Sequence, residues 1–324
     1  MFRRIFIFLL VVAAVLAAGW LALRRDDIPY DSLEAKYTTP ASRFLTLESG
    51  LKVHYRIDGP KDAPVLVMVH GFASSFVTWD DWAEDLSKTY RVVRFDLPGH
   101  GLTRVLATTD LSTDGFTNFV NQMADALQIK SFVLIGSSMG GNTAWNYAVT
   151  HADRLDGLVL VAASGLPEKN EDDEPPLVFK LIRNPITGPM MVDLDITPFI
   201  RDGLKKSFVD QALVTDEMVD RYVELARAPG HRKALLELAT RRETDIDVKM
   251  EKMKSVNVPV LILFGEQDHV VPPSFGEVYA SYFPQSKLVM YDNVGHLPQE
   301  EIPARSLEDL TAFLTGDVFT TSPE

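Results

Sequence analysis

The stretch Phe132-Val133-Leu134-Ile135-Gly136-Ser137-Ser138-Met139-Gly140-Gly141 decides the fold of this chain. A short apolar strand runs directly into a G-x-S-x-G motif, and residues 142–150 have the pattern of a helix. A serine between a strand and a helix at this spacing sits on a tight turn that holds its backbone in a strained, positive-φ region. Gly136 and Gly140 flank Ser138 at two residues on either side, where a Cβ would collide with the serine backbone. The motif therefore predicts a serine presented as a nucleophile.

Three further segments are apolar strands that end in polar loops. Val65 to Val69 is a continuous apolar run, as in a buried parallel strand, and it ends in His70-Gly71-Phe72. Residues 260–264 form another such run, followed by Gly265-Glu266-Gln267-Asp268. A last strand at 287–291 leads into a loop that contains Gly295-His296. The order along the chain is therefore serine, acid, histidine.

Taken together, these motifs resemble those of the α/β-hydrolases, whose catalytic residues run in that order. The resemblance covers residues from about 42 to 315 and includes Asp96-Leu97-Pro98-Gly99-His100-Gly101. Within the superfamily the set is similar to that of bacterial serine esterases and lipases, and of carbon–carbon bond hydrolases that act on meta-cleavage products. Dehalogenases and epoxide hydrolases of the same fold carry an aspartate where this chain has Ser138.

The resemblance implies both a fold and a set of roles. The fold is α/β, an eight-stranded, mostly parallel sheet with helices on both faces and a helical cap inserted after the sixth strand. Ser138 is the expected nucleophile, His296 the general base, and Asp268 the acid that orients the imidazole. The backbone N–H groups of Phe72 and Met139 are expected to hold the oxyanion. The residues expected to support these loops are His70, Gly71, Gly136, Gly140 and Asp96.

Other residues compete for some of these roles. Glu266 and Asp292 are alternatives to Asp268, because both lie in the same loops as the acid and the base. Asp96 is interpreted as a brace for the turn at residues 98–101. His269 precedes the last strand, whereas the base is expected after it. Three more histidines are expected on the surface of strands or helices without a role, and these are His54, His151 and His231.

The order of elements supports the same fold. A hairpin at residues 44–57 is followed by strands and helices in alternation, which indicates a parallel sheet covered on both faces. We expect the core at residues 43–164 and 259–315, and a polar tail at 316–324. Between 165 and 258 the alternation stops, and this segment is the predicted cap, over the carboxyl ends of the strands. Apolar residues expected to supply part of an acyl pocket there are Leu177, Val178, Phe179, Leu181, Ile182, Met190, Met191, Phe199 and Ile200.

The amino terminus has a separate pattern. Residues 5–23 contain no charge and are bracketed by Arg3-Arg4 and Arg24-Arg25, a length that spans a bilayer. We interpret residues 1–25 as an uncleaved membrane anchor, with a cleaved signal peptide as the alternative. Residues 26–42 are the predicted tether. The flanking arginines nearly cancel in the positive-inside rule, but a lone amino-terminal segment usually exports the domain attached to it. We therefore expect the catalytic domain outside the cytoplasm, periplasmic or extracellular, or secreted if the segment is cleaved.

Charge and cysteine content exclude several classes of function. The chain carries a net charge of −13, although residues 1–25 hold four arginines and no acid. A field of this sign repels nucleic acid and favours neutral substrates over acidic ones. There is no cysteine, so disulfides and thiolate metal sites are excluded. No clustering of histidine with carboxylates indicates a metal, and no cofactor is expected.

The sequence thus predicts a membrane-anchored serine hydrolase that cleaves carboxylic esters of small to medium, mostly apolar acyl groups. One alternative is hydrolysis of a carbon–carbon bond in a vinylogous diketone, which a basic cap residue paired with a substrate carboxylate would favour. The candidates for that residue are Arg183, Arg201 and Lys205. A non-catalytic ligand-binding protein on this fold is the alternative from another class. Perhydrolysis, transacylation and thioester cleavage also stay open, because only the acceptor of the acyl group or the leaving group differs.

Overall fold

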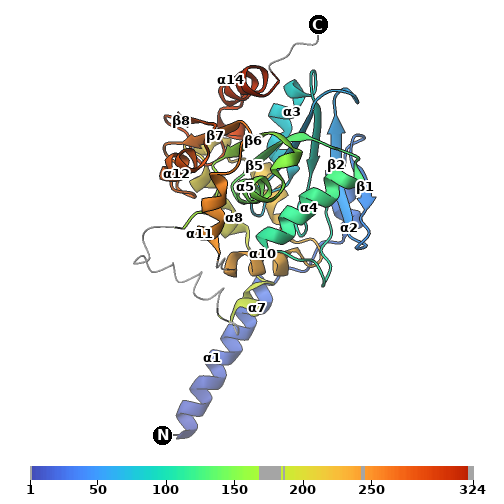
Figure 1. Ribbon diagram of the computed structural model, residues 1–324. Helices are drawn as coiled ribbons and strands as arrows, with labels where there is room; N and C mark the ends of the chain where they lie inside the picture. Colours follow the sequence, from blue (N-terminus) through green and yellow to red (C-terminus); the bar gives the residue numbers. More distant parts are fainter. Residues whose placement is uncertain (1, 168–183, 185–186, 242–244, 320–324) are drawn as a thin grey trace.

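A computed structural model describes residues 2–167, 184, 187–241 and 245–319 (Figure 1). Within these residues eight strands form one sheet in the order β1-β2-β4-β3-β5-β6-β7-β8. The hairpin β1–β2 lies at one edge, β2 pairs antiparallel with β4, and all other neighbours are parallel. The predicted α/β-hydrolase sheet is confirmed. The strands are β1 (Arg43–Thr46), β2 (Lys52–Asp58), β3 (Val65–Val69), β4 (Arg91–Phe95), β5 (Phe132–Ser137), β6 (Leu155–Val161), β7 (Val260–Gly265) and β8 (Ser286–Tyr291).

Helices cover both faces of the sheet, so its central strands are buried on both sides. One apolar cluster joins α4, α5 and α12 to the sheet, and a second cluster on the opposite face includes residues of α3 and α14. In β3, Val67 and Val69 belong to the first cluster while Leu66 and Met68 belong to the second, as the period of a strand requires. These helices are α3 (Asp80–Leu86), α4 (Thr113–Ala126), α5 (Met139–His151), α12 (Ser274–Tyr282), α13 (Pro298–Glu301) and α14 (Pro303–Phe313).

A helical insertion separates β6 from β7, within the segment predicted as a cap. Part of it packs around its own apolar cluster, which includes Leu204, Phe208 and Val219. The expected pocket residues at 177–182 lie outside the described part of the chain. Phe199 is exposed, and Ile200 packs on that separate cluster. The helices of the insertion are α7 (Thr187–Met191), α8 (Thr197–Ser207), α9 (Asp216–Ala226), α10 (His231–Thr240) and α11 (Ile246–Met253).

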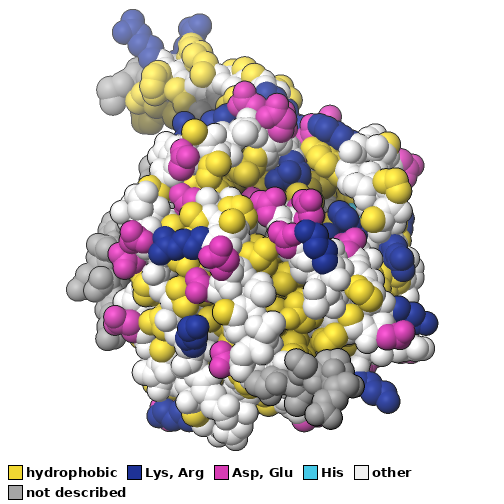
Figure 2. All heavy atoms as spheres, turned by 90° about the horizontal axis from the view of Figure 1, so that it is seen from above, with side chains coloured by type: hydrophobic (Ala, Val, Ile, Leu, Met, Phe, Trp, Pro, Cys, Tyr) yellow, Lys and Arg dark blue, Asp and Glu magenta, His cyan; other side chains and the backbone are white. Residues whose placement is uncertain are grey.

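The first helix, α1 (Phe2–Leu23), projects away from the domain next to α7 and α10 (Figure 1). It is long and apolar enough to cross a membrane by length and composition, and its most apolar window is not buried against the rest of the chain. Many of the exposed large apolar side chains lie on it, Phe6 and Phe8 among them. On the face of the molecule seen in Figure 2, acidic and basic side chains are interspersed, so the acidic excess does not gather into one patch there.

The segment predicted as a tether is folded onto the domain. We call residues 24–37 the strap; it includes α2 (Tyr30–Tyr37). At its start, Arg25 N–H donates to the Asp193 carbonyl (2.8 Å) and the Arg232 guanidinium pairs with Asp27 (2.6 Å). At its end, Glu34 accepts from Arg104 of the core (2.7 Å). The strap therefore joins the helical insertion to the core, which a free tether would not do.

One apolar side chain anchors the strap. Leu33 is 1% exposed and belongs to a cluster with Leu102 of the core and with Leu225 and Ala228 of the insertion. The eight-residue helix that carries Leu33 is too short to be stable alone, so this tertiary packing supports it.

We expect Leu33→Ala to lower the free energy of unfolding by about 2–5 kcal/mol, because the substitution removes buried methyl groups and leaves a cavity. Urea unfolding of the full-length protein in detergent micelles, followed by tryptophan fluorescence, measures this effect. Ser32→Ala, on an exposed position of the same helix, is the matched control and should change stability little. Equal stability of the two variants would show that the strap does not support the domain.

The predicted polar tail also begins in contact with the domain. Residues 314–318 form a short π-helical turn in which Leu314 is buried. Val318 and Phe319 pack against the second apolar cluster, and the Phe319 ring lies 5.8 Å from that of Tyr90. The prediction is therefore wrong for residues 318–319, because these two apolar side chains extend the packing of α14, whereas residues 316 and 317 are exposed. Residues 320–324 lie outside the described part.

Candidate active site

The elbow serine has the geometry that its motif predicts. Ser138 lies between the end of β5 and the start of α5, with φ 54° and ψ −118°. Glycine is needed on both sides: a Cβ at Gly136 would lie 2.2 Å from the Gly140 carbonyl oxygen, and one at Gly140 would lie 2.2 Å from the Val69 carbonyl oxygen. A non-glycine residue at such a φ stores about 1–3 kcal/mol of strain, which folded proteins keep mainly at functional positions.

A buried histidine–carboxylate pair lies in the loops after β7 and β8. His296 Nδ1 is 2.7 Å from Asp268 Oδ2, and both residues are buried. The other carboxylate oxygen, Asp268 Oδ1, accepts N–H groups from Val270 (2.7 Å) and Val271 (2.9 Å). These bonds fix the carboxylate plane. An ionised Asp268 then keeps the proton of the neutral imidazole on Nδ1, which leaves Nε2 as the basic atom.

The rival acids lie elsewhere. Asp292 pairs with Arg305 (3.1 Å) at the surface, where 78% of its side chain is exposed. Glu266 is exposed, and so is His269, the histidine that adjoins Asp268. Among the predicted alternatives, the structure thus brings Asp268 to His296 and leaves the others in solvent.

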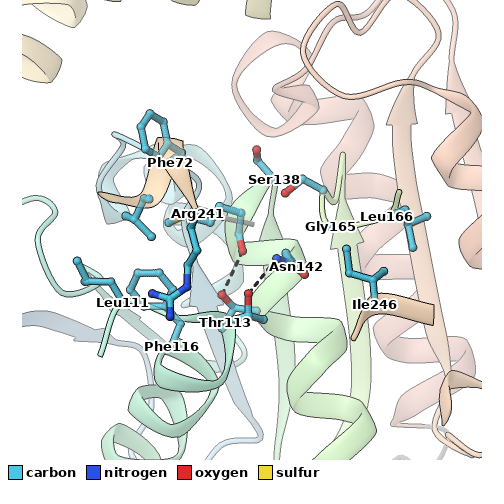
Figure 3. Close-up of a pocket in the computed structure, with 14 residues that line it drawn as sticks. Phe72, Leu111, Thr113, Phe116, Ser138, Asn142, Gly165, Leu166, Arg241 and Ile246 are labelled. Carbon is cyan, nitrogen blue, oxygen red and sulfur yellow. Dashed lines mark hydrogen bonds between the residues drawn. The ribbon is translucent and has the colours of Figure 1, made fainter. Parts of the chain in front are cut away.

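Ser138 opens into a pocket of about 310 Å³ (Figure 3). Phe72 and Met139, the residues predicted to supply the oxyanion donors, line the same pocket. Most of its wall is apolar, and part of that wall comes from α10 and α11 of the insertion. The apolar lining residues are Leu111, Phe116, Leu166, Leu238 and Ile246, together with Phe72 and Met139.

Among the lining residues that sequence reasoning did not name is Arg241, which follows α10. Of the described residues that line this pocket, Arg241 alone carries a formal charge, and its side chain extends toward Thr113 and Phe116 (Figure 3). Its guanidinium also pairs with Glu237 at 3.5 Å. The basic residues predicted for this role lie elsewhere: Arg201 pairs with Asp216 and Lys205 is exposed, while residue 183 lies outside the described part. No local pattern distinguishes Arg241 from other surface arginines.

The loop after β3 lies directly against Ser138, since a Cβ at Gly71 would be 3.0 Å from Ser138 Cβ. His70 orients this loop: its Nε2 accepts from Leu97 N–H (2.9 Å), and its Nδ1 donates to the Gly71 carbonyl (2.8 Å). In a trans peptide the C=O and the following N–H point in opposite directions. His70 therefore fixes the direction of the Phe72 N–H.

Burial lowers the pKa of His70 below its usual value of 6.5, which agrees with an Nε2 that accepts a hydrogen bond. Below pH 6.5 the unfolded chain takes up a proton at this position that the folded protein resists. Its contribution to stability is therefore fully present above pH 6.5 and declines as the pH falls below it.

We expect the stability difference between the wild-type protein and His70→Gln to narrow as the pH falls below 6.5, because glutamine does not titrate. Urea unfolding of both proteins at several pH values measures that difference. The pH-dependent contributions of the other buried histidines cancel in it, because both proteins share them. A difference that stays constant with pH would show that His70 is not held neutral by the fold.

Asp96 is a buried carboxylate whose bonds hold the neighbouring loops. It accepts from His54 Nδ1 (2.8 Å), from Phe76 N–H (2.9 Å) and from Leu102 N–H (2.9 Å). Burial alone would raise its pKa, but the bond from His54 and the nearby imidazoles hold it below the usual value. The bond to Leu102, just after the turn at 98–101, agrees with the predicted brace.

Two histidines expected at the surface are buried, so those predictions are wrong. His54 faces Asp96 from the buried side of β2. His231, at the start of α10, contacts the Tyr30 hydroxyl (2.9 Å) and the Leu225 carbonyl (2.9 Å). Both side chains serve contacts between segments far apart in the sequence. Among the residues that the structure describes, no three His, Asp or Glu side chains gather as a metal site.

Comparison with known proteins places this geometry in context. A family model described as "alpha/beta hydrolase fold" matches residues 64–303. The monoacylglycerol lipase ABHD6 of Bos taurus is 28% identical over 270 residues, which are 79% of this chain and 77% of the relative.

Two solved structures share the fold. One, a membrane phospholipase A described as a bacterial virulence factor, has a TM-score of 0.71 at 23% identity; the match covers 98% of this chain and 99% of that protein. The other, a meta-cleavage product hydrolase (CumD), has a TM-score of 0.71 at 23% identity and covers 84% of this chain and 97% of its own. At this identity the likeness concerns the fold.

Proposed function

Because the chain belongs to the α/β-hydrolase family, we propose that it is a serine hydrolase that cleaves carboxylic esters of small to medium, mostly apolar acyl groups. The observation that carries the proposal is the buried pair of His296 and Asp268, 2.7 Å apart, in a protein whose elbow serine lines an apolar pocket. A pocket of about 310 Å³ lies at the lower end of the range for small-molecule sites.

In the proposed reaction the Ser138 hydroxyl attacks the ester carbonyl while His296 Nε2 takes its proton. The carbonyl oxygen becomes an oxyanion, which the N–H groups of Phe72 and Met139 stabilise. Collapse of this intermediate expels the alcohol, and His296 returns the proton to it. A water molecule then attacks the acyl-enzyme with His296 again as base, releasing the carboxylic acid and the free serine.

The remaining parts of the chain have proposed roles as well. Residues 165–258 act as a cap, since Leu238, Arg241 and Ile246 line the pocket beside Ser138. Residues 5–23 anchor the protein in a membrane, with the domain outside the cytoplasm. A membrane anchor keeps an esterase close to the esters of membrane lipids. The monoacylglycerol lipase relative supports an ester of this kind as the natural substrate.

Arg241 favours one alternative, the hydrolysis of a carbon–carbon bond in a vinylogous diketone that carries a carboxylate. A guanidinium beside an apolar pocket is suited to bind such a group through paired hydrogen bonds, and the Arg241 side chain is 37% exposed to solvent. The existing pair with Glu237, at 3.5 Å, weakens this argument because it already balances part of the charge.

The test is hydrolysis of p-nitrophenyl esters from acetyl to palmitoyl by the full-length protein in detergent micelles. A maximum at short or medium acyl chains that disappears in Ser138→Ala supports the ester hydrolase and measures its acyl pocket. If the series is not hydrolysed while a fluorophosphonate still labels Ser138, the ester proposal fails and the carbon–carbon alternative is favoured. Absence of labelling in the folded protein would overturn both, and favour the non-catalytic alternative.

A further inference from the structure

The loop that carries His296 rests on the carboxyl end of α8. His296 N–H donates to the Ser207 carbonyl at 2.7 Å. The neighbouring Gly295 lies so close to the same carbonyl that a Cβ there would be 2.5 Å from its oxygen. The backbone of the base is thus in direct contact with the insertion.

Glu301, at the end of α13, joins the same two segments. Its Oε2 accepts from Gly295 N–H (2.7 Å), while its Oε1 accepts from Val209 N–H (2.7 Å) and Asp210 N–H (2.9 Å). Three backbone donors therefore converge on one carboxylate. Hydrogen bonds to an ionised acceptor are about twice as strong as neutral ones.

Helix α8 is also held at its other end. Asp195 Oδ1 accepts from Thr197 N–H (2.9 Å), and Asp195 N–H donates to the Leu23 carbonyl (2.9 Å) at the end of α1. The Asp195 carboxylate pairs with Arg25 of the strap (3.0 Å). Helix α8 and the contacts at its two ends thus connect the end of α1 to the loop of His296.

We propose that Glu301 is a positioning residue: it fixes the loop of His296 to α8 and so holds the imidazole where it can serve both Asp268 and Ser138. The inference rests on the proposed function, in which His296 is the base. A displacement of about 1 Å in a reacting group can lower turnover by about 10²-fold. The three hydrogen bonds of Glu301 restrain Gly295, which precedes His296, and the backbone that follows α8. We therefore expect their loss to lower kcat.

Two substitutions separate geometry from charge. Glu301→Gln keeps the length of the side chain but has one oxygen, so its NH₂ group must face at least one of the backbone N–H donors. Glu301→Asp keeps the charge but is one methylene shorter and does not span both segments. Glu308→Gln, the same change at an exposed position of α14, is the matched control.

The experiment uses the full-length protein in detergent micelles with p-nitrophenyl butyrate. We expect both Glu301 variants to lower kcat by about 10–100-fold with KM changed by less than about threefold, and Glu308→Gln to match the wild type. We also expect the far-downfield proton resonance of His296 Nδ1–H, which reports its hydrogen bond to Asp268, to weaken or disappear in both variants.

A wild-type kcat and an intact resonance in folded Glu301→Gln would overturn the proposal, as would full recovery by Glu301→Asp, which would show an effect of charge. A fall in thermal stability alone, with kcat unchanged in the folded protein, would assign Glu301 to folding only. The resonance is measured without turnover. If the wild type fails to hydrolyse any ester, the proposed function fails, while the resonance still decides whether Glu301 holds the His296 loop.

Discussion

Ser138→Ala is expected to lower kcat for p-nitrophenyl butyrate by about 10⁴-fold or more, because the proposed acyl-enzyme forms on the Ser138 hydroxyl. The hydroxyl of Ser138 is the atom that the elbow presents, and the glycines on either side of it lie so close to neighbouring backbone that neither has room for a Cβ. The measurement is burst and steady-state release of p-nitrophenol, together with labelling by a fluorophosphonate. Both signals should disappear in the variant.

The neighbouring serine provides the control for this prediction. Ser137 is the last residue of β5, and its hydroxyl lies 3.5 Å from the Gln299 amide nitrogen, too far for a strong bond. Ser137→Ala should therefore keep labelling and turnover within about threefold of the wild type. Labelling that persists in Ser138→Ala but is lost in Ser137→Ala would identify Ser137 as the nucleophile and refute the assignment of Ser138.

The fold and the motifs that carry the candidate site were predictable because local rules dictate them. A buried parallel strand is a run of apolar residues whatever its neighbours are, and the elbow requires glycine near Ser138 for steric reasons within a few residues. The loops after β7 and β8 likewise follow their strands directly, so His296 and the competing acids could be placed in them, while the choice of Asp268 over Glu266 and Asp292 rested on the resemblance to the α/β-hydrolases.

The strap was not predictable because its stability comes from distant partners. Helix α2 has eight residues and little apolar surface, and the other buried residues of the Leu33 cluster follow it by about 70 positions (Leu102) and about 190 positions (Leu225 and Ala228). His54 and His231 were misplaced for the same reason. The pattern of β2 or α10 does not reveal that another segment covers the polar side chain.

Arg241 illustrates a different limit. Its place in the pocket depends on how the insertion packs over the carboxyl ends of the strands, and periodicity carries no information on that packing. The net charge of −13 favoured neutral substrates, but net charge describes the whole surface and does not locate a single charged side chain beside a pocket.

Asp268→Asn is expected to lower kcat by about 10⁴-fold while the protein stays folded. The reason lies in the second carboxylate oxygen. Asp268 Oδ1 accepts two backbone N–H groups, from Val270 and Val271, so the amide oxygen of asparagine takes that place and its NH₂ group faces His296 Nδ1. A donor there forces the imidazole proton onto Nε2. The base then has no lone pair to accept the proton of Ser138.

The two rival acids, Asp292 and Glu266, provide controls for this prediction. Each can be changed from a carboxylate to an amide, as in Asp268→Asn. Asp292→Asn breaks an exposed pair with Arg305 and Glu266→Gln alters an exposed side chain, so each should keep kcat within about threefold of the wild type. Single-turnover acylation of the three variants by a p-nitrophenyl ester separates them, since the defect lies in the chemical step. If Asp292→Asn acylated slowly and Asp268→Asn did not, the buried pair would be structural and the acid of the triad would be Asp292.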